Sequence, residues 1–345
     1  MFNQLIGNET VKQSLQRMLE AKRLPGALLF SGEEGTGKKL FALEIARALN
    51  CRTLRGVGGC GECSICQRIG RLNYPQSEES EGWKTIIWSD HGDVGMVVAP
   101  KRLLLVDQMR QIEREANFRP FEGKSRVFLI DDADKMNEPS ANALLKVLEE
   151  PPPTSHLILI TSQPAMLLPT IRSRCQVVRF SPLSAKEIEN HLVQAEKTPP
   201  KEAALRARVA RGSLGRALAS NSKQLSGQRS AMLEVLRALA VTGDRLRLLR
   251  SAEELNEARY KDEFEARLDI LETLIRDALA VAVGAPESQL INSDLLPELS
   301  VISGKISTGQ AATWITQIEE MREQLVVNIN RKVASDALLM AMASA

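Results

Sequence analysis

The sequence predicts an α/β fold, in which a parallel β-sheet carries helices on both faces, followed by a purely helical remainder. Three observations lead to this prediction. A glycine-rich segment at residues 32–39 joins an apolar run to a helical pattern. Further short apolar runs alternate with helical patterns up to about residue 180, which favours a parallel sheet covered on both sides. After about residue 182 the sequence contains no convincing strand pattern.

Four apolar runs are expected to build most of the sheet. These strands are predicted at 27–30, 126–130, 156–160 and 176–180. Helices are predicted at 9–21, 40–49 and 107–116, and from Asn137 to the prolines at 151–153. Asp107 is a candidate cap for the third of these helices. Residues 73–101 are expected to be loop-like, with short strands or strand–helix junctions at 84–88 and 103–106.

Residues 32–39 have the context of a phosphate-binding loop, because a strand precedes the glycines and a helix follows them. Glycines let the backbone curl so that its N–H groups point inward, and the helix N-terminus adds partial positive charge. Lys38 is placed to reach the outer phosphates of a nucleotide. A plain glycine-rich turn is the alternative. The candidate phosphate-binding residues are Gly32, Gly35, Thr36, Gly37, Lys38 and Lys39.

Lys39 departs from the usual pattern of such loops. The residue after the phosphate-binding lysine is normally Ser or Thr, whose hydroxyl binds Mg²⁺. An ammonium group has three donors and no lone pair for a metal. The loop is therefore predicted to hold phosphate but to be poor at placing the metal that phosphoryl transfer requires.

Asp131 and Asp132 follow the apolar run at 126–130. A carboxylate at the end of a buried strand is how phosphate-loop ATPases hold Mg²⁺, so Asp131 is the candidate metal-side carboxylate. Asp132 stands where an active ATPase usually has a Glu that activates water, and its side chain is one methylene shorter. The alternative is an acidic strand end that caps the next turn.

Four cysteines form a third constellation. Gaps of eight, two and two residues separate Cys51, Cys60, Cys63 and Cys66. A Cys-x-x-Cys turn aims two thiolates at one tetrahedral Zn²⁺, and four sulfur ligands close the coordination shell. We therefore predict structural zinc. An iron–sulfur cluster and unliganded thiols are the alternatives.

The composition is globular, with 43% hydrophobic and 26% charged residues, and the length predicts two or three domains. The net charge of +2 gives no overall reason to expect nucleic acid or membrane as a partner. No run of 18 apolar residues and no secretory signal is present, so a cytoplasmic location is expected. Residues 201–250 are nevertheless basic, with 11 Lys and Arg against 3 Asp and Glu, which fits either a DNA-facing or an ordinary solvated surface.

Together these features resemble the bacterial DNA polymerase III clamp-loader family, which belongs to the AAA+ class of phosphate-loop proteins. The matching stretches are 32–39, the four cysteines, 131–136, 141–152 and Ser173-Arg174-Cys175. The resemblance implies three domains: an AAA+ domain at 1–180 with a zinc module at about 51–70, a helical lid at 181–222 and an all-α collar at 223–345. It also implies gamma/tau and delta subunits, the sliding clamp and primed DNA as partners.

The resemblance also gives roles to single residues. Arg174 would be a finger that reaches ATP on a neighbouring subunit, and Thr161 matches a sensor position. The chain looks most like the delta-prime branch, a stator with weak or absent ATPase, because Gly215 stands where the motor has its sensing arginine and Arg216 comes one position late. A gamma/tau-like motor that hydrolyses its own ATP is the alternative; a zinc-bearing AAA+ protein outside replication is a third reading. Zinc is the expected cofactor, with ATP and Mg²⁺ weak in the chain's own site.

Overall fold

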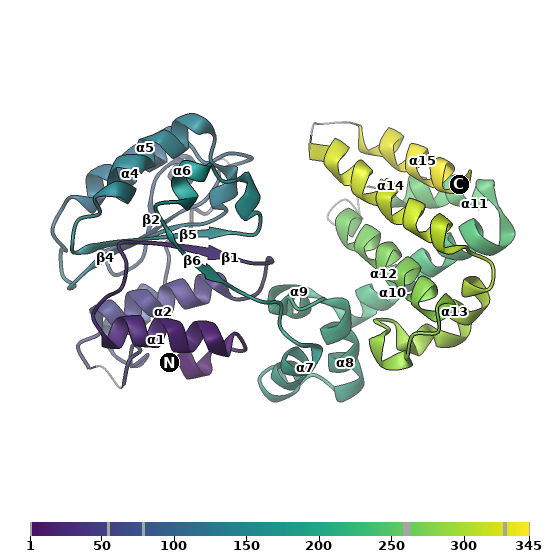
Figure 1. The fold of residues 1–345 in the computed structure, drawn as a ribbon, viewed down its shortest axis with the longest axis horizontal. Coiled ribbons are helices and arrows are strands. Elements are labelled where there is room, and N and C mark those ends of the chain that lie inside the picture. Colours follow the sequence, from purple (N-terminus) through teal and green to yellow (C-terminus); the bar gives the residue numbers. More distant parts are fainter. Residues whose placement is uncertain (1, 54–55, 78–79, 258–262, 327–329, 345) are drawn as a thin grey trace. The chain divides into compact units, whose positions relative to one another are not determined.

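The computed structural model describes residues 2–53, 56–77, 80–257, 263–326 and 330–344. The chain divides into two compact units (Figure 1). The N-terminal unit comprises Met1–His191 and Arg211–Arg216, and the C-terminal unit comprises Leu192–Ala210 and Ala217–Ala345. The three-domain division expected from the sequence remains a prediction.

The N-terminal unit is built on a six-stranded sheet in the order β2-β3-β4-β5-β1-β6. The strands are β1 (Ala27–Ser31), β2 (Ile87–Trp88), β3 (Val94–Val97), β4 (Arg126–Ile130), β5 (Ser155–Thr161) and β6 (Gln176–Arg179). All neighbouring pairs are parallel except β2 with β3. The predicted parallel α/β sheet is confirmed, with one short antiparallel edge strand.

The expectation that residues 73–101 are loop-like was wrong for β3, which is fully buried beside β4. This strand contains Gly95, which in sequence looks like a break. In the fold a glycine is required there, because a Cβ atom would lie 2.4 Å from a side-chain carbon of Ile86. Residues 103–106 form the predicted strand–helix junction, because Leu104 makes an isolated β-bridge to Met136 and α4 (Val106–Ala116) begins at the end of the segment. Asp107 lies inside α4, and Leu105 is the N-cap.

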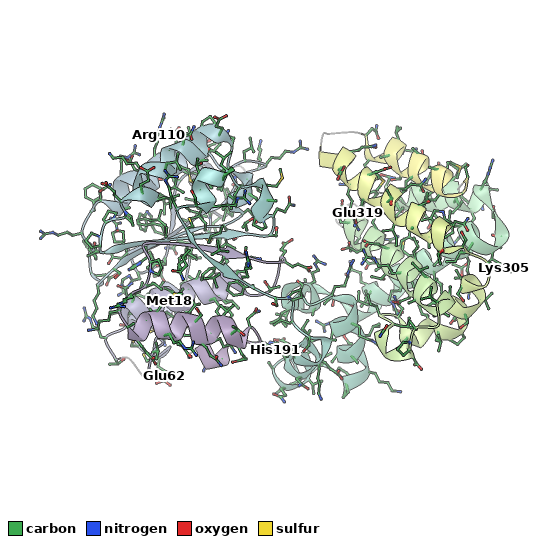
Figure 2. The ribbon with its side chains drawn as sticks, in the orientation of Figure 1. Met18, Glu62, Arg110, His191, Lys305 and Glu319 are labelled. Atoms are coloured by element: carbon green, nitrogen blue, oxygen red, sulfur yellow. The ribbon has the colours of Figure 1, made fainter. Side chains whose placement is uncertain are left out.

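Helices cover both faces of this sheet (Figure 1). On one face lie α1 (Glu9–Glu20) and α2 (Lys38–Asn50), whose apolar side chains share a core with Phe30 and Val127. On the other lie α4 (Val106–Ala116) and α5 (Glu138–Glu149), packed with Leu29 and Phe128. Met18 on α1 and Arg110 on α4 lie on opposite sides of the sheet (Figure 2). The alternation of side chains along each strand supplies both cores.

Shorter helices complete the described part of this unit. They are Phe2–Gln4, α3 (Ser64–Ile69), Glu81–Lys84, Ala133–Lys135, Pro164–Met166, α6 (Pro169–Arg172) and the start of α7 (Ala185–Gln194). The predicted start of α5 is confirmed: Asn137 is its N-cap and accepts a hydrogen bond from the Ser140 backbone N–H.

The C-terminal unit is helical throughout its described residues. Its longer helices are α8 (Pro200–Val209), α10 (Ser222–Arg237), α11 (Arg245–Leu255), α12 (Phe264–Ala282), α13 (Leu296–Ser303), α14 (Thr308–Val326) and α15 (Arg331–Met342), and α9 (Leu214–Ala219) straddles the boundary between the units. A π-helical turn, Ala238–Thr242, continues α10. Phe264 and Trp314 are among its largest buried side chains.

Several residues of the basic stretch have partners within this unit. Arg206 donates to the Ala217 carbonyl, and buried Arg229 binds the Asp294 carboxylate through both terminal nitrogens. These arginines therefore stabilise the unit itself, whereas Arg245, Arg247 and Arg250 on α11 are exposed. Among the described residues, no helix combines the length and the apolarity needed to cross a bilayer.

Candidate functional site

The glycine-rich loop connects β1 to α2 at the carboxyl edge of the sheet. Its glycines have φ values of 149° at Gly32, 73° at Gly35 and 91° at Gly37, which L-residues with a Cβ rarely adopt. Ser31 pairs with Thr161 in the sheet register, and the Gly32 N–H donates to the Thr161 carbonyl. Because β1, β4 and β5 are parallel, the loop, Asp131 and Thr161 all come to the same edge.

Lys38 turns back onto its own loop. Its ammonium donates to the carbonyl oxygens of Gly32 and Glu33, each at 2.6 Å. The side chain is buried, and this burial lowers the pKa of Lys38. The Thr36 hydroxyl also donates to the Glu33 carbonyl, at 2.8 Å. These groups, predicted to bind phosphate, are therefore engaged by the loop itself.

Lys39 brings a cation to Asp131, the carboxylate predicted to face a metal. Its ammonium lies 3.3 Å from Asp131 Oδ2 and 5.5 Å from the centre of the Tyr74 ring. Burial by itself would lower the pKa of Lys39, but the Asp131 charge and the Tyr74 side chain raise it above its usual value. The sequence analysis did not identify Tyr74, which lies in the segment expected to be loop-like.

The side chains of Asp132 and Thr161 contact other residues at this edge of the sheet. The Asp132 carboxylate binds Lys135 at 2.7 Å, and its backbone adopts a left-handed φ of 51°. The Thr161 hydroxyl donates to the Asp134 carboxylate. Asp132 lies two residues after the end of β4 and is the N-cap of the turn at Ala133–Lys135, as the alternative of an acidic strand end suggested, although its side chain makes no capping hydrogen bond.

The segment Ser213–Gly215 lies against the glycine-rich loop. The Gly215 N–H donates to the Gly35 carbonyl at 3.1 Å. A Cβ on Gly35 would lie 2.0 Å from the Ser213 hydroxyl oxygen, and one on Gly215 would lie 3.2 Å from Gly35 Cα. Glycine at 215 thus permits backbone contact where an arginine was expected in a motor subunit. Ser213 is a contact that the sequence analysis missed.

The four predicted cysteine ligands come together. Cys51 is the C-cap of α2, Cys63 is the N-cap of α3, and Cys66 lies in α3. All four sulfurs lie within 4.8 Å of one another. The Cys51–Cys63 and Cys60–Cys66 sulfur distances are 3.9 Å, close to the roughly 3.8 Å between sulfurs in a tetrahedral site with metal–sulfur bonds of about 2.3 Å. The cluster therefore fits a metal ion.

Neighbouring groups support this cluster. The Thr53 hydroxyl and the backbone N–H groups of Cys63 and Glu62 lower the pKa of Cys60 to about 5. Burial raises the pKa of Cys66. From α2, the buried Glu44 carboxylate accepts the Gly59 N–H at 3.1 Å, and Arg47 Nε donates to the Cys66 carbonyl at 3.1 Å. The helix that follows the glycine-rich loop thus also holds the cysteine loop.

Arg174 lies after α6, and its side chain is about one third exposed. Cys175 beside it is buried, and burial raises the pKa of that thiol to about 12, so this fifth cysteine is neutral and part of the core. The Arg174 guanidinium binds Glu149 at the end of α5 and the Thr170 carbonyl. Glu149 is a further residue that sequence reasoning did not single out.

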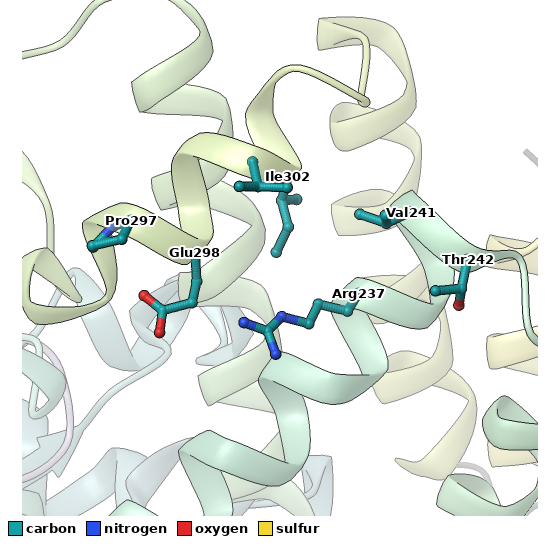
Figure 3. Close-up of a pocket in the computed structure, with 7 residues that line it drawn as sticks. Arg237, Val241, Thr242, Pro297, Glu298 and Ile302 are labelled. Atoms are coloured by element: carbon teal, nitrogen blue, oxygen red, sulfur yellow. The ribbon is translucent and has the colours of Figure 1, made fainter.

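A surface cavity of about 470 Å³ lies in the C-terminal unit between α10, the π-helical turn and α13. Arg237 and Glu298 extend toward each other across it (Figure 3). Val241, Val301 and Ile302 supply much of its apolar lining. None of the predicted site residues lines this cavity, and nothing in the structure identifies an occupant.

Comparison with known proteins places the chain among replication proteins. It is 28% identical over 320 residues to the DNA polymerase III subunit delta' of Bacillus subtilis (strain 168), covering 93% of this chain and 91% of that protein. It is 29% identical over 334 residues to the delta' subunit of Escherichia coli (strain K12), covering 95% and 92%. The tau subunit of Bacillus subtilis is 30% identical over 278 residues, covering 79% of this chain and 46% of that protein.

Two family descriptions match successive parts of the sequence. The family described as DNA polymerase III, delta subunit, matches residues 7–184, and that described as DNA polymerase III, delta subunit, C terminal, matches residues 224–342. The first match alone covers the sheet, the glycine-rich loop, the cysteines and Arg174. The chain therefore belongs to the DNA polymerase III delta subunit family.

Proposed function

We propose that this chain is a delta-prime-type stator of the clamp loader, which assembles with gamma/tau and delta subunits and helps to place the sliding clamp on primed DNA in the cytoplasm. The near full-length similarity to two delta' subunits supports this role.

The observation that carries the stator assignment is the Lys39–Asp131 ion pair. In a working ATPase this carboxylate faces Mg²⁺, which neutralises the phosphates during transfer. Here a covalently attached ammonium lies beside it and offers no ligand to a metal. Together with Gly215, which packs on Gly35 in place of a sensing arginine, this ion pair supports a nucleotide site with little or no turnover.

The proposed chemical contribution is made at a neighbour's site through Arg174. A guanidinium is permanently charged and planar, which suits it to charge developing on a transferred phosphoryl group. Ile171 and Cys175 are buried on either side of it along the chain, so the backbone is anchored while the side chain reaches the surface. This arrangement supports a finger that acts on another subunit.

Zinc is the proposed metal of the cysteine cluster. The four sulfur donors at near-tetrahedral spacing leave no position for a substrate, so the metal would be structural. When bound, zinc would hold the loop between α2 and α3 in its folded form.

Two measurements test the function. The isolated chain should hydrolyse ATP far more slowly than the order of 1 s⁻¹ that marks an ordinary enzyme. A loader reconstituted with Arg174→Ala should lose about 10³-fold in turnover at the one site served, and hence part of its total DNA- and clamp-stimulated ATPase. Arg174→Lys should restore little of the lost rate, because an ammonium is a point charge and does not reproduce the planar set of N–H donors on a guanidinium.

Arg172→Ala provides the matched control, because it removes an exposed arginine two residues away. Equal clamp loading by the Arg174→Ala and wild-type loaders would refute the finger. Rapid turnover by the isolated chain, abolished by Lys38→Ala, would favour the motor alternative instead.

A further inference from the structure

The Arg174 side chain is held from the side by a single carboxylate. Glu149 Oε1 accepts a hydrogen bond from Arg174 Nε at 2.8 Å and lies 2.5 Å from Nη2. The two residues are 25 positions apart in the chain, so the contact is tertiary. Nη1 donates to the Thr170 carbonyl at 3.0 Å and lies 3.5 Å from the Ser173 hydroxyl oxygen. Together these contacts fix both the plane and the direction of the guanidinium.

The position of Glu149 is not explained by the preferences of its own helix. It is the last residue of α5, where the carbonyl end of the helix carries partial negative charge and disfavours a carboxylate. Glu149 is half exposed, so it is not needed to fill the core. The nearby cation that offsets this unfavourable placement is Arg174, which indicates that the pair acts as one unit.

We propose that Glu149 is a positioning residue for Arg174, an inference that rests on the proposed finger role. An exposed arginine has many rotamers, and a finger must present its N–H groups to a phosphate in one orientation. The Glu149 carboxylate accepts from the Nε edge of the guanidinium, and the Thr170 carbonyl accepts from Nη1. The guanidinium is therefore oriented before the neighbouring subunit binds. Misplacement of a catalytic group by about 1 Å can cost on the order of 10²-fold in rate.

The test uses loaders reconstituted with Glu149→Ala, with Arg174→Ala and with both substitutions. Glu149→Ala should lower kcat for stimulated ATP hydrolysis at the served site by about 10-fold and leave KM for ATP nearly unchanged, because the group orients the finger and does not bind the nucleotide. In the Arg174→Ala background, Glu149→Ala should have no further effect. Glu149→Asp should recover part of the rate.

Glu150→Ala is the matched control, since it removes an exposed carboxylate from the next position. Thermal unfolding of each isolated variant should stay close to wild type, which excludes a general loss of folding. Three results would overturn the inference: an unchanged or faster rate with Glu149→Ala, an equal loss with Glu150→Ala, or an additional loss in the Arg174→Ala background. If Arg174→Ala itself has no effect, the finger role fails, and this failure is distinguishable from the failure of Glu149 alone.

Discussion

The two ends of helix α2 differ in how the negatively charged groups beside them are balanced. At its first turn, Lys39 supplies a cation to Asp131, and the positive end of the helix dipole adds to it. Just after its last residue begins the cysteine cluster, where four sulfurs converge within 4.8 Å of one another. The first site carries its own countercharge, whereas the proposed zinc would supply the countercharge at the second.

Under the proposed stator function, the Lys39–Asp131 pair would let the nucleotide site keep its fold without a metal. Thiolates crowded within 4.8 Å repel one another unless a metal binds them. A single carboxylate is satisfied by a single ammonium. We therefore expect the cysteine module to depend strongly on metal and the glycine-rich loop to be indifferent to it.

The largest expected effect is loss of metal. Cys63→Ser should abolish binding of about one zinc per chain and unfold the module locally, because metal binding there also stabilises folding, by on the order of 10 kcal/mol. The sheet should stay folded, since it has cores of its own on both faces. Metal analysis and hydrogen exchange measure the two consequences.

Cys175→Ala serves as the control for this experiment, because Cys175 is buried apart from the cluster and should leave the metal content unchanged. Iron with visible absorbance in place of zinc would contradict the proposed metal.

A smaller effect, on the free energy of unfolding, is expected when a Cβ atom is added to a glycine of the glycine-rich loop. Gly35→Ala should destabilise the chain by about 1–3 kcal/mol, from a left-handed backbone and from the clash with Ser213. Gly37→Ala has a similarly positive φ but meets nothing within 4 Å, so it should cost only the backbone part. Equal denaturation midpoints for the two variants would argue against the contact with Ser213.

Replacing Lys39 should change the Mg²⁺ dependence of nucleotide binding more than it changes the stability of the fold. Lys39→Thr removes a partly exposed ion pair, worth roughly 0.2–1 kcal/mol, and restores a hydroxyl beside Asp131. Nucleotide affinity should then improve with added Mg²⁺, as measured by calorimetry with and without a chelator. Lys39→Met, which has neither charge nor hydroxyl, should show no such gain in affinity. A gain in both variants would disprove the idea that a hydroxyl at position 39 is what allows Mg²⁺ to bind.

The smallest effect concerns pH. The pKa of Lys39 is raised in the folded chain, so its stabilising contribution is fully present below the unfolded value of 10.5 and is lost as pH rises through the folded pKa. The stability difference between wild type and Lys39→Met should therefore be constant from about pH 6 to 9 and shrink only above about pH 10.5.

Metal retention by the cysteine cluster should instead weaken on acidification, because thiols must lose their protons to bind a metal. Thermal unfolding at a series of pH values measures the contribution of Lys39, and metal release over the same series measures retention by the cysteine cluster.

Much of the N-terminal unit could be predicted because local patterns and tertiary packing agree there. The strands predicted at 126–130 and 156–160 each contain four uninterrupted apolar residues, and Asn137 caps the helix that it was expected to begin. The spacing of the four cysteines was sufficient to predict a cluster, since two overlapping Cys-x-x-Cys turns bring sulfurs together wherever the loop lies.

Only the tertiary structure decided how those elements meet. Strand β3 was missed because Gly95 weakens its pattern, although the packing of Ile86 leaves no room for a larger residue. The partners Tyr74, Ser213 and Glu149 were not apparent because each lies far along the chain from the residue that it contacts. Sequence determined which charges, thiols and glycines are present; folding decided that Lys39 lies beside Asp131 and that the four cysteine sulfurs come within 4.8 Å of one another.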